Sequence, residues 1–421
     1  MTDPGTRVAP YGPAALRRAA PALLGYAAVR ALGLLVLAGW SGARDKSAYT
    51  LLTARWDALW YTRVAELGYG YEVRLPNGDV HSNLAFFPLL PWLERLLHAL
   101  TPLSYGAAGF VVSLCASLAA AWGIFAVADR VYGRRVGVCA VLVWAVLPVG
   151  IVQSMAYSES LFTALAAWSL YAVLTGRWVT AGLLASLAGL TRPVGLAVVA
   201  AVWAAGVVSF VRERGAARGA GARPGDSAPR PPSPPARPRE GARGGASRAA
   251  RAAGLLLAPT GAAGYVLWVG HRTGKGPLGY LDVQAGWRNG FDGGLAFARF
   301  VGAKFTPGQS GPALPSVLAG VALTAGVAAL IWLYVVCVRR RQPLPLLVHT
   351  GVVLALALCA SSYFGSKPRL LMPAFPLLFP PAQALAALAA RRPVRAAVIV
   401  GGAAVASAVY GAWWLNGSGP P

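Results

Sequence analysis

The sequence is poor in charged residues. Asp, Glu, Lys and Arg make up 12% of its 421 residues, about half of the roughly 25% that is typical of soluble domains. Cysteine and histidine are also rare, with four of each. The cysteines lie inside apolar runs without close spacing and the histidines are scattered, so we expect no disulfide framework, no metal site and no cofactor.

Nucleotide-binding patterns are absent as well. The sequence contains no Walker loop and no Gly-rich strand-to-helix turn, which argues against an enzyme driven by ATP or a nucleotide sugar. The formal net charge of +24 invites an assignment to nucleic-acid binding. In an apolar chain, however, basic residues more often mark the cytoplasmic side of a membrane protein. We therefore expect no nucleic-acid partner.

Apolar runs are what the sequence has in abundance: 56% of its residues are hydrophobic, and several runs approach the roughly 20 residues that cross a bilayer. We predict an all-α polytopic membrane protein with about eleven transmembrane helices. The first run is predicted to be retained, because it is long for a signal peptide and no small-residue cleavage site follows it. The runs lie near residues 20–40, 105–127, 136–154, 160–175, 178–191, 194–211, 254–270, 314–338, 345–362, 370–390 and 394–415.

Basic connections set the predicted orientation. With the N-terminus in the cytoplasm, the Arg-containing connections after the second, fourth, eighth and tenth runs all fall inside, as the positive-inside bias requires. Residues 212–252 also fall inside, with ten Arg against three acidic residues and many Pro, Gly, Ala and Ser. We predict that they form a disordered basic linker, a solvated tether rather than a contact to anionic lipid. It divides an N-terminal block (1–211) from a C-terminal block (253–421). The heavy use of Ala, Gly, Arg and Pro suggests a high-GC bacterial genome, and with the apolar runs it leads us to expect a multi-pass protein of a bacterial cell membrane.

The same orientation gathers the polar segments on the outer face. They are the loop 41–104, the junction 153–160, residues 191–195, the loop 271–313 and residues 361–371. In the first loop, Asp57 sits between aromatic residues within "RWDALWY". A carboxylate partly removed from water suits a general base near neutral pH, but an Asp can equally cap the helix that follows. This stretch alone does not decide between the two.

Other charged residues lie at outer helix ends. Glu159, in "AYSESLF", begins a run, where the helix dipole favours a carboxylate with or without a function; an acid at membrane depth is nevertheless a functional candidate. Arg192, Lys367 and Arg369 lie outside, against the usual charge bias. They are predicted to clamp a phosphate, and the alternative is snorkelling to lipid headgroups.

Two further outer segments have recognisable patterns. Gln284 and Trp287, in "YLDVQAGWRNGF", are a candidate sugar-binding set, because an aromatic face suits sugar C–H groups and an amide can hydrogen-bond hydroxyls. The segment "HSNLAFFPLLPWLERLLHAL" (81–100) is predicted to contain an amphipathic helix on the outer leaflet. That helix is either a structural shelf, which we favour, or an aid to the entry of a lipid-linked substrate.

Taken in order, the stretches "RWDALWYTRVAELGY", "AFFPLLP", "AYSESLF", "TRPVG", "QAGWRNGF" and "KPRLLMPAFP" resemble the PIG-V-type mannosyltransferases. This group includes the enzyme that adds the second mannose in GPI-anchor assembly. The resemblance implies a GT-C glycosyltransferase that takes a sugar from a polyprenyl-phosphate donor on the extracytoplasmic side, usually with inversion. Two features depart from the family: the eukaryotic motif has Ser-Asn where this chain has Pro193-Val194, and the Arg-rich linker is not expected.

The resemblance also assigns roles. It implies that Asp57 is the catalytic base, that Glu159 is the acid of the second motif, and that the cations named above bind the donor phosphate. With Gln284 and Trp287 we group Arg55, Trp56 and His81 of the first loop as predicted substrate-binding residues.

The expected reaction is transfer of a sugar, with mannose the first candidate, to a glycan, lipid or protein acceptor, within a membrane-lipid environment and without a metal. The alternative is a transporter or flippase of a lipid-linked sugar, which would also place charges at membrane depth. Transporters often consist of two similar halves, and the sequence shows no internal repeat.

Overall fold

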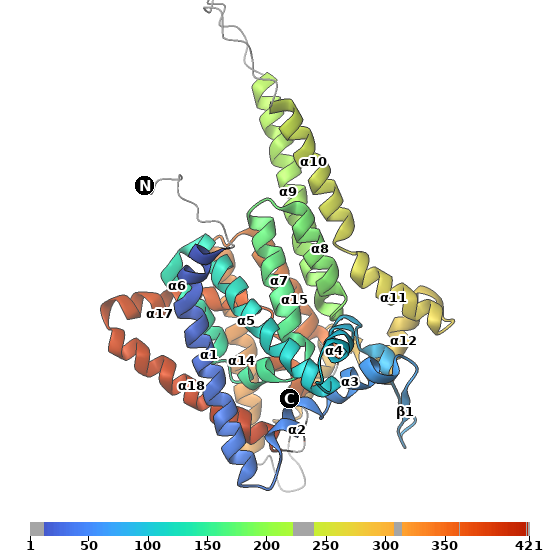
Figure 1. Ribbon diagram of the computed structural model, residues 1–421. Coiled ribbons are helices and arrows are strands. Elements are labelled where there is room, and N and C mark those ends of the chain that lie inside the picture. Colours follow the sequence, from blue (N-terminus) through green and yellow to red (C-terminus); the bar gives the residue numbers. More distant parts are fainter. Residues whose placement is uncertain (1–11, 222–239, 307–313, 362, 418, 420–421) are drawn as a thin grey trace, which may run out of the picture.

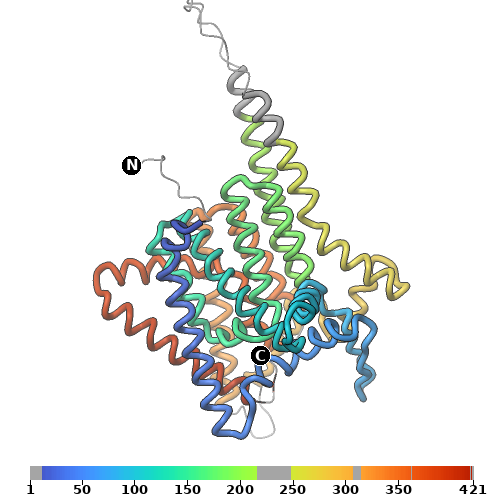
Figure 2. The backbone as a smooth tube through the Cα atoms, in the orientation of Figure 1, coloured from blue at the N-terminus to red at the C-terminus, as the bar shows by residue number. Residues whose placement is uncertain are grey.

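The computed structural model describes residues 12–221, 240–306, 314–361, 363–417 and 419, and within them the chain is a bundle of helices (Figures 1 and 2). The first part of the chain supplies most of the core. Its helices are α1 (Pro13–Gly42), α2 (Ala48–Thr53), α3 (Asp57–Leu67), α4 (Leu89–Leu100), α5 (Tyr105–Tyr132), α6 (Arg134–Ala145), α7 (Ser158–Leu174), α8 (Trp178–Gly189) and α9 (Leu196–Gly221).

The later part packs around this core. Its helices are α10 (Glu240–Leu257), α11 (Thr260–Arg272), α12 (Gly279–Gly286), α13 (Leu295–Gly302), α14 (Leu314–Arg339), α15 (Leu344–Cys359), α16 (Lys367–Leu370), α17 (Phe379–Arg391) and α18 (Pro393–Leu415). Short 3-10 helices join them: η1 (Asn83–Ala85), η2 (Gly150–Ser154), η3 (Pro193–Gly195), η4 (Gly276–Leu278), η5 (Phe364–Ser366) and η6 (Phe375–Leu378).

Small residues allow the central helices to approach one another closely. A Cβ atom on Gly123 of α5 would lie 2.8 Å from Ala167 of α7, and this close packing is how helices associate where the hydrophobic effect between them is weak. Tyr26 of α1 stacks on Trp144 of α6 with ring centroids 5.5 Å apart. The largest core cluster contains residues of α1, α5, α6 and α7, and residues of α9, α15, α17 and α18 pack into it.

Within the described residues, six helices are long and apolar enough to cross a membrane, and a seventh span results if the bent pair 364–370 and 375–391 counts as one. Three shorter apolar helices, α7, α8 and α15, accompany them. Each of the eleven predicted apolar runs coincides with one or two helices, so the all-α polytopic prediction is confirmed. The described residues do not confirm a count of eleven complete spans.

The segment predicted as a disordered linker is helical at both ends. Helix α9 continues to Gly221 and α10 begins at Glu240, whereas residues 222–239 lie outside the described residues. Arg251 donates to Glu213 and to Ser209 across the two helices at 2.5 and 2.8 Å, and this pairing compensates for the polar composition. The two helices run side by side and project beyond the bundle (Figure 1).

The outer segments named above gather at the opposite end of the bundle from that projection (Figure 1). In the first loop, β1 (Glu72–Arg74) pairs antiparallel with β2 (Val80–Ser82). Two later outer segments are joined by a second antiparallel pair, β3 (Gly290–Phe291) with β4 (Ala360–Ser361). The predicted amphipathic helix is α4. It buries Leu90 and Glu94 and exposes Trp92, Leu96 and Leu100 on its other face.

The helical structure breaks twice, between α6 and α7 and between α15 and α17, and these breaks bring polar groups of the site together. After α6 ends at Ala145, Arg30 of α1 donates to the carbonyls of Ala145 and Gly150, and Gln153 donates to that of Trp144 at 2.9 Å. These contacts satisfy backbone groups that have no water to bind. The second break lies between α15 and α17, where Trp144 Nε1 donates to Met372 at 3.2 Å.

Candidate active site

Asp57 is the first residue of α3, and the residue before it has an unusual backbone conformation. Trp56, the N-cap, has φ 52° and ψ −125°, a region that bulky residues avoid and that costs on the order of 1–3 kcal/mol. The Asp57 N–H donates to the Tyr157 hydroxyl at 3.4 Å. The strained turn therefore fixes the direction in which the Asp57 carboxylate leaves the helix.

Glu159 lies in the first turn of α7, directly after the first helix break. Its side chain is 1% exposed, and a buried carboxylate requires a partner. Arg192 provides it: Nη1 lies 2.5 Å from Glu159 Oε1 and also donates to Ser158 Oγ at 3.1 Å. Ser158 in turn shares a hydrogen bond of 2.7 Å with the Tyr61 hydroxyl, which links α7 to α3.

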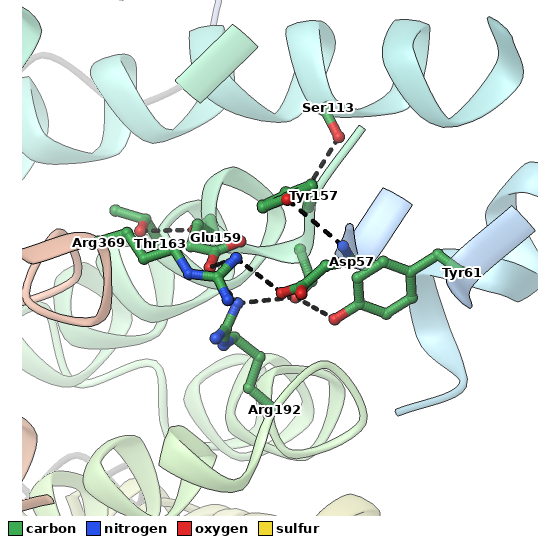
Figure 3. A network of polar contacts seen from close by, with 9 residues as sticks. Asp57, Tyr61, Ser113, Tyr157, Glu159, Thr163, Arg192 and Arg369 are labelled. Atoms are coloured by element: carbon green, nitrogen blue, oxygen red, sulfur yellow. Dashed lines mark hydrogen bonds and ion pairs between the residues drawn. The ribbon is translucent and has the colours of Figure 1, made fainter. Parts of the chain in front are cut away.

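Arg369 joins the two acids. It comes from α16, inside the second helix break, and is 9% exposed. Its Nη1 lies 2.7 Å from Asp57 Oδ2 and 3.5 Å from Glu159 Oε1, and its guanidinium lies over the Tyr157 ring at 5.1 Å. Figure 3 shows these side chains pointing toward one another from four separate elements.

We call Asp57, Glu159, Arg192 and Arg369 the charge tetrad. Its two carboxylates and two guanidiniums balance, which is how charges are held in a low-dielectric interior. A carboxylate can accept a proton from a hydroxyl, and a guanidinium can bind a phosphate through paired hydrogen bonds. The tetrad thus holds the groups needed for proton abstraction and for anion stabilisation at one place.

Two tyrosines border the tetrad, and analysis of the sequence missed their part in it. Burial raises the pKa of Tyr61 and of Tyr157 above the ordinary value, so both hydroxyls stay protonated and can donate. In the sequence, Tyr61 is only one of the aromatic residues that surround Asp57 in "RWDALWY". The "YSES" motif could have identified Tyr157 and Ser158, because they lie next to Glu159, but only Glu159 was predicted as a site residue.

Lys367 lies apart from the tetrad although it is close to Arg369 in the sequence. Its ammonium group donates to the carbonyls of Ala357 and Ala360 at 2.6 and 2.8 Å and lies over the rings of Phe297 and Phe364. A cation at the end of α15 satisfies carbonyls that the helix leaves unpaired. The structure therefore places two of the three predicted phosphate-binding cations together.

The predicted sugar-binding residues of the two outer loops contact each other. His81 stacks on Trp287 with ring centroids 4.0 Å apart, and Trp60 meets the same indole edge-on at 4.9 Å. The Trp287 N–H donates to the Ser82 carbonyl at 3.0 Å. The Gln284 amide donates to Tyr280 at 2.5 Å and accepts from Asn289 at 2.9 Å. The Trp287 contact joins loop 271–313 to β2 and the Gln284 contacts lie within that loop, so these polar groups are already used within the protein.

Arg55, the remaining predicted residue, stacks on Trp56 with its guanidinium 4.2 Å from the ring centroid. Both side chains are partly buried beside Asp57. In the described part of the chain, no group of three or more His, Cys, Asp or Glu residues has the arrangement of a metal site.

The chain is similar to two solved structures of other membrane proteins. ArnT from Cupriavidus metallidurans bound to undecaprenyl phosphate matches with a TM-score of 0.50 and 14% identity, over 88% of this chain and 62% of that one. The oligosaccharyltransferase AglB from Archaeoglobus fulgidus, in complex with an inhibitory peptide and a dolichol-phosphate, matches with a TM-score of 0.47 and 14% identity, over 94% and 56%. The match to ArnT confirms the predicted GT-C-like fold.

This chain spans about three-fifths of the length of ArnT. No curated protein matches it. The family model for Mannosyltransferase (PIG-V) matches residues 35–212, the part that contains α2 to most of α9 and three of the four tetrad residues, Asp57, Glu159 and Arg192. The resemblance found in the sequence is thereby confirmed over residues 35–212, which are similar to the PIG-V mannosyltransferase family.

Proposed function

We propose that the protein transfers a sugar, with mannose the first candidate, from a polyprenyl-phosphate donor to an acceptor on the extracytoplasmic side of the membrane. The observation that carries the proposal is the tetrad: a partly exposed carboxylate, Asp57, lies 2.7 Å from a buried guanidinium, Arg369, that can hold a phosphate. The PIG-V family match and the GT-C-like fold support the reaction class.

In the proposed step, the Asp57 carboxylate takes the proton of an acceptor hydroxyl while the hydroxyl oxygen bonds to C1 of the sugar. The bond from C1 to the phosphate oxygen breaks, and its electron pair stays on the polyprenyl phosphate. Arg369 and Arg192 stabilise the charge that develops there. Attack opposite the leaving group inverts the anomeric centre. Glu159 keeps Arg192 in place, since its side chain is 1% exposed and contacts that guanidinium directly.

The proposed orientation puts the N-terminus in the cytoplasm and the tetrad on the extracytoplasmic side. The basic connections between helices support it. So does the position of the outer segments, which lie at the end of the bundle opposite the α9–α10 projection (Figure 1). The acceptor is a glycan, a lipid or a protein that presents a hydroxyl group at this membrane surface.

The test compares membranes that contain the wild-type protein, Asp57→Asn or Glu66→Gln, each supplied with radiolabelled polyprenyl-phosphate mannose and a crude pool of lipid and protein acceptors. Glu66 is the matched control, because it is an exposed carboxylate on the same helix, α3. We expect transfer by the wild type and by Glu66→Gln, and a loss of at least about 100-fold in Asp57→Asn. Transfer that survives in Asp57→Asn would move the base elsewhere. Failure of the wild type with mannosyl, glucosyl and arabinosyl donors would refute the reaction class.

A further inference from the structure

In this structure, the group proposed to bind the donor phosphate already holds an anion. Arg369 is paired with Asp57, and Arg192 with Glu159. Each cation of the tetrad therefore has a carboxylate partner before any substrate arrives. An incoming phosphate competes with these carboxylates for the same guanidinium N–H groups, since both kinds of anion bind a guanidinium through paired hydrogen bonds.

The contacts show which pair is easier to separate. Glu159 is 1% exposed, so leaving it without a partner would strand a charge away from water. The Arg192 that it holds is anchored a second time, by Ser158 at 3.1 Å. Asp57 is 22% exposed and would be solvated when released. Arg369 is thus the cation that can change partners.

We propose that the donor phosphate displaces Asp57 from Arg369, so that donor binding is what frees the catalytic base. The exchange makes and breaks no covalent bond: one guanidinium passes from a carboxylate to a phosphate. It rests on the function proposed above and adds an order to it, in which the lipid-linked donor binds first and the hydroxyl acceptor second. Without donor, Asp57 remains held in its ion pair with Arg369.

Competition for one cation predicts a change in donor affinity that can be measured without any sugar transfer. Removing the charge of Asp57 must strengthen binding of a polyprenyl phosphate, even though the same change removes the proposed base. We expect Asp57→Asn to bind undecaprenyl phosphate about fivefold to tenfold more tightly than the wild type, which corresponds to about 1 kcal/mol. Arg369→Gln should bind it at least tenfold more weakly. Asp57→Asn should give no gain when Arg369→Gln is already present.

The experiment uses the full-length protein in phosphatidylcholine nanodiscs, with undecaprenyl phosphate binding measured by native mass spectrometry. Glu66→Gln controls for the loss of one negative charge on α3 away from the tetrad, and it should bind like the wild type. Size-exclusion profiles and melting curves establish that each variant is folded. The double variant isolates the competition, because it lacks both the carboxylate and the guanidinium for which phosphate would compete.

The outcomes separate the two proposals. Wild-type binding with equal or weaker binding by Asp57→Asn would overturn the exchange and leave the proposed function standing. An equal gain in Glu66→Gln would also overturn it, because the effect would then be general electrostatics. A wild type that neither binds undecaprenyl phosphate nor transfers sugar would overturn the proposed function, and the exchange with it.

Discussion

Arg369→Met tests whether the tetrad is a cooperative unit. The change keeps an unbranched apolar side chain but removes the charge that lies 2.7 Å from Asp57 and 3.5 Å from Glu159. Breaking a buried ion pair by removing one partner costs about 3–5 kcal/mol, because it leaves an uncompensated charge. Asp57 is 22% exposed and keeps part of its hydration, so the lower end, about 3 kcal/mol, applies.

Unfolding by titration with SDS, followed by tryptophan fluorescence, measures this loss. The second arm adds Asp57→Asn, which removes the stranded charge. Because the two residues are in contact, the double variant should recover about 2 kcal/mol relative to Arg369→Met alone, and a double-mutant cycle reports that coupling. Transfer should fall at least about 100-fold in Arg369→Met, as for the removal of one donor to a developing anion. Unchanged stability, or strictly additive effects, would refute the ion pairing.

Three further predictions concern features outside the tetrad. A methyl group added to Gly261 of α11 would collide with the carbonyl of Ser186, so Gly261→Ala should cost about 1–3 kcal/mol in SDS titrations; Gly264→Ala, with nothing within 4 Å, should cost nothing. Trp287→Ala should part the two outer loops and speed tryptic cleavage at the basic residues of its own loop. Burial raises the pKa of Glu94 well above 4.5 and favours its neutral form, so stability should fall as pH rises from 4.5 through that raised pKa. Glu94→Gln should remove this dependence from melting curves.

Each of these has a result that contradicts it. Equal costs for the two glycine variants would mean that α11 and α8 are not in close contact. Unchanged proteolysis after loss of the indole would mean that the loops are held by other contacts. A pH dependence that persists in Glu94→Gln would assign it to another group.

The sequence predicted the helices well because a long apolar run is stable inside a lipid bilayer. There the backbone N–H and C=O groups can hydrogen-bond only to one another, which favours a helix. It also predicted that charged residues gather on one face, since the spacing of runs alternates the sides. The sequence did not predict which acid of the tetrad pairs with which cation. Asp57 and Arg369 lie at opposite ends of the chain, and nothing in either stretch specifies which cation meets which acid.

The predicted clamp of three cations shows that residues close in sequence need not contact the same site. Lys367 and Arg369 are two residues apart in α16, and helical residues at that spacing do not face each other. One side chain therefore turns to the carbonyls at the end of α15, and the other turns to the acids. In the same way, the composition of residues 212–252 predicted disorder, because a composition does not reveal that Arg251 meets Glu213 across two helices.

The residues of the tetrad come from both blocks of the chain. Asp57 and Glu159 each lie in the first turn of a helix, where the dipole favours a carboxylate by about 0.3–1 kcal/mol, but a dipole alone does not balance two charges in a site this buried. Arg192 balances one of them. The second cation, Arg369, comes from beyond the family-matched residues 35–212. A chain ended at residue 212 should therefore keep the family-matched residues yet bind no undecaprenyl phosphate in nanodiscs, whereas binding by that fragment would show that Arg369 is dispensable for the donor.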